Sequence, residues 1–115
     1  MDASLPKQER LCGKTAVAAL FEHGKSFQSG CLRCKYLRRE SSDAARIIIS
    51  VPKRNFKRAV KRNLLKRRIR ESYRRQKALV APGMDILFIY TLREVLPYEA
   101  IYADMTKALE SLGNE

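Results

Sequence analysis

The sequence has few of the residues from which protein enzymes build hydrolytic or metal sites. It contains one histidine, His23, no tryptophan, and twelve carboxylates without a recurring spacing over 115 residues. Phosphodiester hydrolysis by protein groups needs clustered carboxylates that hold Mg²⁺, or histidines for acid–base work. We therefore expect no catalytic residue, no metal site and no small-molecule substrate. His23, beside Gly24 at a predicted helix end, is expected to act in capping.

Cysteines are also scarce. Cys12, Cys31 and Cys34 are an odd set, and a zinc site usually takes four ligands. Cys31 and Cys34 are three residues apart in a predicted strand, which should turn them to opposite faces. The first ten residues lack the apolar segment of a secretory signal, and no apolar run is long enough to span a membrane. We therefore expect reduced thiols in a cytoplasmic protein without a membrane partner.

Positive charge is abundant, and it is concentrated in one segment. The chain carries a formal net charge of +12. The segment from Lys53 to Arg75 holds 12 lysines or arginines and a single acid, Glu71, whereas the rest of the chain is nearly neutral. A charge of this size predicts a polyanionic partner.

Hydrophobic spacing predicts a single domain over residues 1–115, with residues 1–10 as a flexible arm. The predicted order αβββαβα is typical of an α+β fold in which helices pack on a sheet. We expect three helices, over 14–23 with a left-handed C-cap at Gly24, from 59 to about 79, and from Pro97 to Gly113. Strands are expected over 32–38, 46–51 and 85–91. A turn over 40–43 and a basic loop over 52–58 connect these elements.

The long helix combines an apolar stripe with a ladder of cations. At 100° per residue, Leu65, Ile69 and Tyr73 share one side together with Ser72, and we expect this stripe to pack against Ile47, Ile49, Leu87 or Ile89. Like charges four residues apart repel one another, yet the helix stacks Arg62, Lys66, Arg70 and Arg74 at that spacing. Phosphates would neutralise such a surface, so the helix predicts nucleic-acid binding. Lys61, Arg68 and Arg75 are expected on the far side.

The segment from Lys53 to Glu71, KRNFKRAVKRNLLKRRIRE, resembles the signature of the bacterial ribonuclease P protein family. In that signature Ala-Val-x-Arg-Asn-x-x-Lys-Arg-x-x-Arg-Glu follows a basic loop after an apolar strand. This chain has Leu64 where the family commonly has arginine. The resemblance implies a two-layer α/β sandwich like a domain of a small-subunit ribosomal protein, with a left-handed βαβ crossover that departs from the usual right-handed rule.

The resemblance also implies two RNA partners, the catalytic RNA of ribonuclease P and precursor tRNA, with Mg²⁺ required by the RNA-containing enzyme and none held firmly by the protein. The chain would then be a non-catalytic subunit that assists removal of the 5′ leader of precursor tRNA. The residues expected to contact the catalytic RNA are Lys53, Arg54, Lys57, Arg58, Arg62, Asn63, Lys66, Arg67, Arg70 and Arg74.

In the family, the 5′ leader lies in a cleft between the sheet and the first helix. The matching positions in this chain are Val17, Phe21, Lys35 and Tyr36. The family often has an aromatic residue where Val17 stands, and aromatic rings suit stacking with single-stranded bases. Phe21 can be interpreted either as a leader contact or as a core residue.

Two other interpretations remain open from the sequence. A ribosomal or other structural RNA-binding protein would have the same charge without the 59–71 pattern. A DNA-binding module is a third possibility, although the chain has no recognisable helix-turn-helix or zinc framework.

Overall fold

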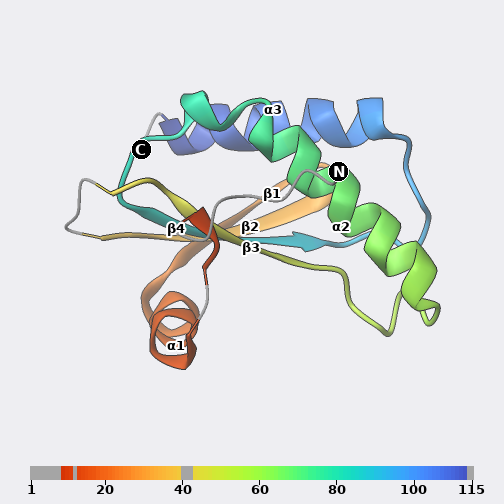
Figure 1. The fold of residues 1–115 in the computed structure, drawn as a ribbon, viewed down its shortest axis with the longest axis horizontal. Helices are drawn as coiled ribbons and strands as arrows, with labels where there is room; N and C mark the ends of the chain where they lie inside the picture. Colours follow the sequence, from red (N-terminus) through yellow and green to blue (C-terminus); the bar gives the residue numbers. More distant parts are fainter. Residues whose placement is uncertain (1–8, 12, 40–42, 114–115) are drawn as a thin grey trace.

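The computed structural model describes residues 9–11, 13–39 and 43–113. A four-stranded sheet carries two helices on one face and one helix on the other (Figure 1). The elements follow the chain as α1 (Lys14–His23), β1 (Lys25–Ser29), β2 (Leu32–Arg38), β3 (Arg46–Ser50), α2 (Ala59–Arg74), the short 3₁₀ helix η2 (Lys77–Leu79), β4 (Met84–Tyr90) and α3 (Tyr98–Gly113). The predicted element order is confirmed.

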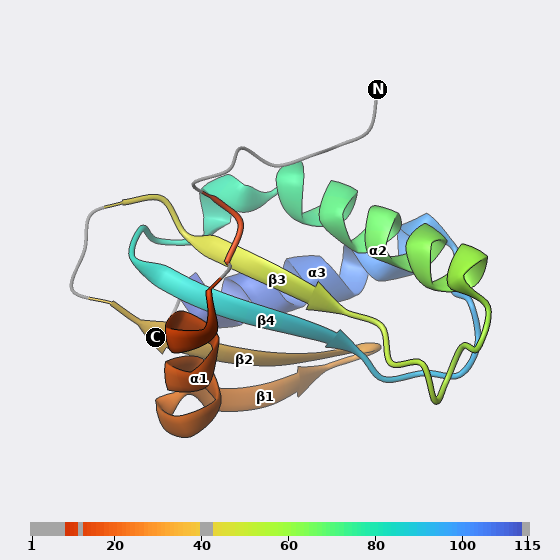
Figure 2. The ribbon, with the colours of Figure 1, turned by 60° about the horizontal axis from the view of Figure 1, so that its bottom comes forward.

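The sheet is mixed, with the strand order β1-β2-β4-β3. The pairs β1/β2 and β2/β4 are antiparallel, whereas β3 and β4 are parallel and are joined through α2. In Figure 2, which views the sheet from the α1 side, α2 lies behind the sheet and the β3–α2–β4 crossover is left-handed. This hand is rare, and it places α2 on the same face as α3, leaving the other face to α1. The sheet with α2 and α3 forms the expected two-layer α+β sandwich.

Strand alternation separates the apolar side chains into two clusters. Ile47 and Ile49 of β3 join the large cluster beneath α2 and α3, as predicted. Leu87 and Ile89 do not, because on β4 it is Ile86, Phe88 and their alternates that face α2 and α3. Leu87 and Ile89 belong to the smaller cluster beneath α1. Their predicted contact with α2 is therefore wrong, because their side chains point to the opposite face of the sheet.

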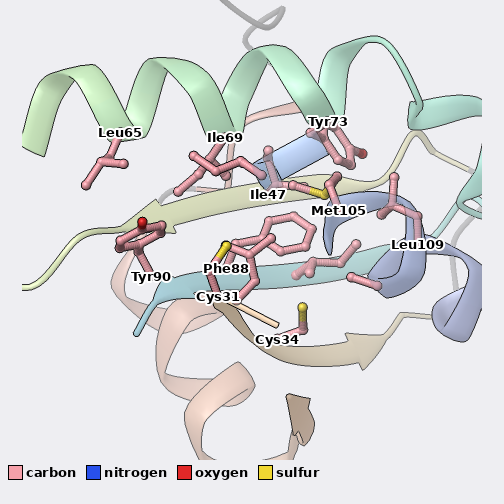
Figure 3. Close-up of a cluster of buried hydrophobic side chains, with 14 of the residues drawn as sticks. Cys31, Cys34, Ile47, Leu65, Ile69, Tyr73, Phe88, Tyr90, Met105 and Leu109 are labelled. Atoms are coloured by element: carbon pink, nitrogen blue, oxygen red, sulfur yellow. The ribbon is translucent and has the colours of Figure 1, made fainter. Parts of the chain in front are cut away.

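The large cluster confirms the predicted phase of α2. Leu65, Ile69 and Tyr73 are at most 1% exposed and point from α2 toward the sheet (Figure 3). Burying a side chain of this size contributes about 1.5–3 kcal/mol. The stripe thereby anchors α2 to the sheet and leaves its cations on the surface.

The helix α2 is one turn shorter than predicted, because Gln76 connects its end to α3. The Gln76 side chain is buried and donates to the carbonyl oxygens of Ser72 and Tyr102, at 3.2 and 3.3 Å. Thr106 donates a further hydrogen bond to the Gln76 side-chain oxygen. These contacts end the helix at Arg74, ahead of the separate turn η2.

The strand β1 is mostly polar, so hydrophobic spacing gives it no range, and it pairs with β2 across a tight turn. Gly30 in this turn has φ +56°, which favours glycine. A Cβ there would lie 2.2 Å from the Asp104 side chain. Asp104 accepts a hydrogen bond from the Cys31 N–H at 2.9 Å, so the hairpin is attached to α3.

Two further expectations need correction. Gly24 is not a left-handed C-cap, since its φ is −72°; glycine is required because a Cβ would lie 2.4 Å from the Leu20 carbonyl oxygen. Of the predicted flexible arm, residues 1–8 lie outside the described residues, while Glu9 forms an ion pair with Lys77 at 2.8 Å and Arg10 bridges to Ile47. The last two residues of the arm are therefore held in place. Residues 40–42 of the predicted turn also lie outside the described residues.

Candidate nucleic-acid interface

The ten residues predicted to contact the catalytic RNA all lie on the surface, on α2 or on the loop before it. None of them is buried, because the apolar stripe occupies the side of α2 that faces the sheet. Within the described part of the chain, Lys66, Arg67 and Arg70 make no ion pair or side-chain hydrogen bond. Cations without a carboxylate partner are suited to binding phosphates.

Arg62 plays a different part from the other cations of α2. Its guanidinium donates to the carbonyl oxygens of Phe56 and Lys57, at 2.7 and 2.9 Å. These bonds fold the basic loop back onto the first turn of α2. Arg62 therefore positions the exposed Lys57 and Arg58 as well as contributing charge of its own.

Glu71, the one acid of the basic segment, is surrounded by arginines. Arg74 and Arg75 donate to its carboxylate at 2.7 and 2.6 Å. These hydrogen bonds lower the pKa of Glu71 to about 2. Arg74 thus reaches the surface already paired, and it is less available to phosphate than Arg67.

The cations expected on the far side of α2 divide into two groups. Lys61 is exposed, as expected. Arg68 instead donates to the Leu96 carbonyl oxygen, and the Arg75 guanidinium lies 6.0 Å from the centre of the Tyr98 ring. Arg68 and Arg75 therefore face the chain that leads into α3.

On the opposite side of the sheet, α1 and β2 bring three of the predicted cleft residues to one face. Phe21 is 55% exposed, which excludes the core interpretation. The Lys35 ammonium lies 5.5 Å from the centre of the Phe21 ring. Val17, half-buried on the same helix, lines an apolar hollow of about 520 Å³. An exposed ring with a cation beside it can bind a base and its phosphate together.

Tyr36 does not belong to this face, and its predicted place in the cleft is wrong. Tyr36 follows Lys35 on β2, so strand alternation turns its ring toward α2 and α3. There it packs edge-on against Phe27, with ring centres 5.9 Å apart, at the margin of the large core. The sequence of β2 mixes polar and apolar residues on both faces, so it does not indicate which face of the sheet carries Tyr36.

The cysteine interpretation needs a similar correction. Cys31 and Cys34 are both buried in the large core, because Cys31 lies in the turn before β2, where strand alternation does not apply (Figure 3). Burial raises the pKa of both thiols to about 12. Cys12 lies outside the described residues. No group of three metal-ligating side chains occurs in the described ranges. His23 is exposed at the end of α1, 3.8 Å from Glu22.

Two further cations, Arg10 and Arg93, lie next to these surfaces. Arg10, expected in a flexible arm, lines a groove beside β3 together with Lys66 and Arg70. Arg93, in the loop after β4, lines a hollow with Lys57, Arg58 and Lys61. Neither position repeats the helical spacing that identified the α2 cations, so no sequence pattern could have placed them there.

Comparison with known proteins assigns the chain to a family. The sequence model of the ribonuclease P family matches residues 5–113. The chain belongs to this family. Two curated relatives named ribonuclease P protein component support the assignment. The relative from Porphyromonas gingivalis is 38% identical, and the aligned region covers 91% of this chain and 83% of the relative. The relative from Nitrosomonas eutropha is 39% identical, and the aligned region covers 97% of this chain and 93% of the relative.

Solved structures agree with the fold. The ribonuclease P protein of Thermotoga maritima superposes with a TM-score of 0.78 at 27% identity, covering 90% of this chain and 96% of its own. That of Staphylococcus aureus gives a TM-score of 0.80 at 24% identity, covering 91% and 95%. As a member of the ribonuclease P family, the chain is a subunit of the endoribonuclease that processes the 5′ end of tRNA, which excludes the ribosomal and DNA-binding alternatives. Membership of this family also implies that the chain has an RNA partner. No helix in the described ranges is long and apolar enough to cross a membrane.

Proposed function

We propose that the chain binds two RNAs on two faces. The loop 52–58 and α2 bind the catalytic RNA of ribonuclease P, while the face formed by α1 and β2 binds the 5′ leader of precursor tRNA. In this proposal the RNA subunit performs the chemistry and holds the Mg²⁺ that cleavage needs, in the cytoplasm. The observation that carries the proposal is the placement of unpaired cations on α2 and of Phe21 with Lys35 on the other side of the sheet.

The first experiment tests the catalytic RNA as partner. The protein is mixed with a catalytic RNA of the ribonuclease P type at low Mg²⁺, and leader removal from precursor tRNA is followed. We expect cleavage with both components and none with the protein alone. Turnover by RNA-free protein, lost on mutating one of its own acids, would contradict the division of labour.

The second experiment tests the leader face. Phe21→Ala removes a stacking surface, so it should weaken binding of precursor tRNA by the assembled enzyme about tenfold and leave mature tRNA unaffected. Leu79→Ala is the matched control, because Leu79 is also a large exposed apolar residue, 46% exposed on η2. Equal losses for the two tRNAs would remove Phe21 from the leader face.

A further inference from the structure

A groove of about 220 Å³ crosses the edge of the sheet beside β3. The three isoleucines of β3 form its apolar floor, and Arg10, Lys66 and Arg70 line it with positive charge. The lysine and the second arginine come from α2, whereas Arg10 comes from the segment that precedes α1. In Figure 2 this segment, drawn in red, runs past β3 toward α1.

The backbone of residues 9–11 is held against β3. Arg10 and Ile47 form a parallel bridge, and the Leu11 N–H donates to the Ile47 carbonyl oxygen at 2.8 Å. Glu9 is tied to Lys77 by its ion pair. These contacts use the main chain or neighbouring side chains. They therefore fix the position of Arg10 and leave its guanidinium without an ion pair among the described residues.

The charge in the groove has no balancing acid among the described residues. Arg10, Lys66 and Arg70 take part in none of the ion pairs or side-chain hydrogen bonds found there. The acids on the neighbouring elements are already engaged, Glu9 with Lys77 and Glu71 with Arg74 and Arg75. Three cations around one apolar floor point to a ligand that carries both negative charge and an apolar surface.

The groove is continuous with the α1 side of the sheet. Leu11 and Ile48 line both this groove and the apolar hollow that contains Val17 and Lys14. A strand bound beside α1 can therefore continue over β3 to the basic face of α2. A duplex keeps the flat faces of its bases stacked inside, whereas a single strand can place a base on an apolar floor and a phosphate among cations.

We propose that the β3 groove carries the single-stranded 5′ leader across the edge of the sheet, with a leader phosphate bound by Arg10 at the point where the groove meets Lys66 and Arg70 of α2. This inference rests on the proposed function and adds Arg10 and the β3 edge to it. The leader then follows one track from α1 to α2, and the face that binds the catalytic RNA begins where that track ends.

The test compares Arg10→Ala with Arg10→Lys in the assembled enzyme, with Lys107→Ala as control for the loss of one exposed cation on α3. We expect Arg10→Ala to weaken precursor tRNA binding about tenfold, leaving mature tRNA binding and affinity for the catalytic RNA unchanged. Arg10→Lys should retain most of the affinity, and Lys107→Ala should have no effect. Equal losses for both tRNAs, a loss only toward the catalytic RNA, or no loss would each overturn the inference.

A second measurement locates the phosphate. Precursor tRNAs are made with one neutral methylphosphonate linkage at successive leader positions. At the linkage that Arg10 contacts, the neutral substitution should weaken binding by the wild-type enzyme but should not weaken binding by the Arg10→Ala enzyme any further. If the effects of the neutral linkage and of Arg10→Ala add at every position, the contact is overturned. Preference of the wild-type enzyme for precursor over mature tRNA tests the proposed function separately. If that preference exists and Arg10→Ala leaves it intact, only the β3 groove is rejected.

Discussion

Lys35 and Tyr36 are adjacent residues on β2, and their side chains lie on opposite faces of the sheet. Lys35 approaches the exposed ring of Phe21, whereas Tyr36 packs on Phe27 at the margin of the large core. The register of β2 on β4 sets this division, since Lys35 lies opposite Leu87 and Tyr36 opposite Ile86. Adjacent residues therefore have different environments: Lys35 lies on the face proposed to bind RNA, and Tyr36 contributes to the core.

Substitution at these two positions should separate binding from stability. We expect Tyr36→Ala to lower the free energy of unfolding by about 2–3 kcal/mol, because a half-buried aromatic residue leaves the core, and to affect both tRNAs equally. Lys35→Ala should change stability little and weaken precursor tRNA selectively. Urea denaturation and tRNA affinities of the assembled enzyme provide the measurements. A selective loss of precursor binding in a stable Tyr36→Ala protein would return Tyr36 to the cleft.

Gly30 is a second residue whose environment dictates its identity. We expect Gly30→Ala to destabilise the protein, because the new Cβ would collide with Asp104 and because φ +56° costs an alanine about 1–2 kcal/mol. In an Asp104→Ala background the collision is removed, so the same substitution should cost only the backbone term. Thermal or urea unfolding of the wild type, the two single variants and the double variant gives the coupling free energy between Gly30 and Asp104. Identical costs in both backgrounds would show that the hairpin moves away from α3.

At the scale of elements, α2 has three sides with different tasks. Its apolar stripe packs on the sheet, Arg68 and Arg75 face the chain leading into α3, and Lys66, Arg67 and Arg70 lack carboxylate partners in the described structure. A helix that was merely solvated would pair more of its cations with acids. The arrangement makes α2 a structural support whose outward cations form the surface proposed to bind RNA.

Arg67→Ala and Arg75→Ala should separate these sides of α2. Arg67 is exposed and unpaired among the described residues, so its loss should weaken binding to the catalytic RNA and reduce the slope of log affinity against log salt by about one. Arg75 is paired with Glu71 and lies over Tyr98, so its loss should change the slope less. Filter binding at several salt concentrations measures both. A larger change for Arg75→Ala would show that RNA approaches α2 from the α3 side.

At the scale of the whole molecule, one large core joins the sheet to α2 and α3. Both described thiols lie in it, along with the ring of Tyr73. Burial raises the pKa of Cys31, Cys34 and Tyr73 to about 12. Folding therefore holds protons on groups that the unfolded chain releases at lower pH.

This linkage predicts loss of stability in alkali. A folded-state thiol pKa of about 12, against 9.0 for an unperturbed thiol, contributes stability that is fully present below pH 9 and is lost as pH rises toward 12. Each thiol can contribute a slope of up to about 1.4 kcal/mol per pH unit in this window. Cys34→Ala should be less stable below pH 9 but should show a shallower alkaline slope, with Cys31 and Tyr73 accounting for the remainder. Urea unfolding on both sides of pH 9 checks this, and an unchanged slope would mean that Cys34 ionises freely in the folded protein.

The sequence by itself determined most elements and the position of the basic surface that is proposed to bind RNA. Helical and strand periodicity located α1, β2, β3, β4 and α3 to within a residue or two, because apolar spacing records which side of an element is buried. The same reasoning set the phase of α2, since Leu65, Ile69 and Tyr73 repeat at helical spacing and leave the flanking cations on the surface. Membership of the ribonuclease P family was likewise readable from the 53–71 segment.

Only the tertiary structure decided what depends on contacts between distant parts of the chain. Gln76 ends α2 through α3, strand register turns Tyr36 away from the cleft, and the turn before β2 brings Cys31 to the same core as Cys34. Arg10 became a candidate RNA contact because a main-chain bridge to Ile47 holds it beside α2. Local patterns report the periodicity of one element, whereas these outcomes follow from how separate elements meet, which no single segment encodes.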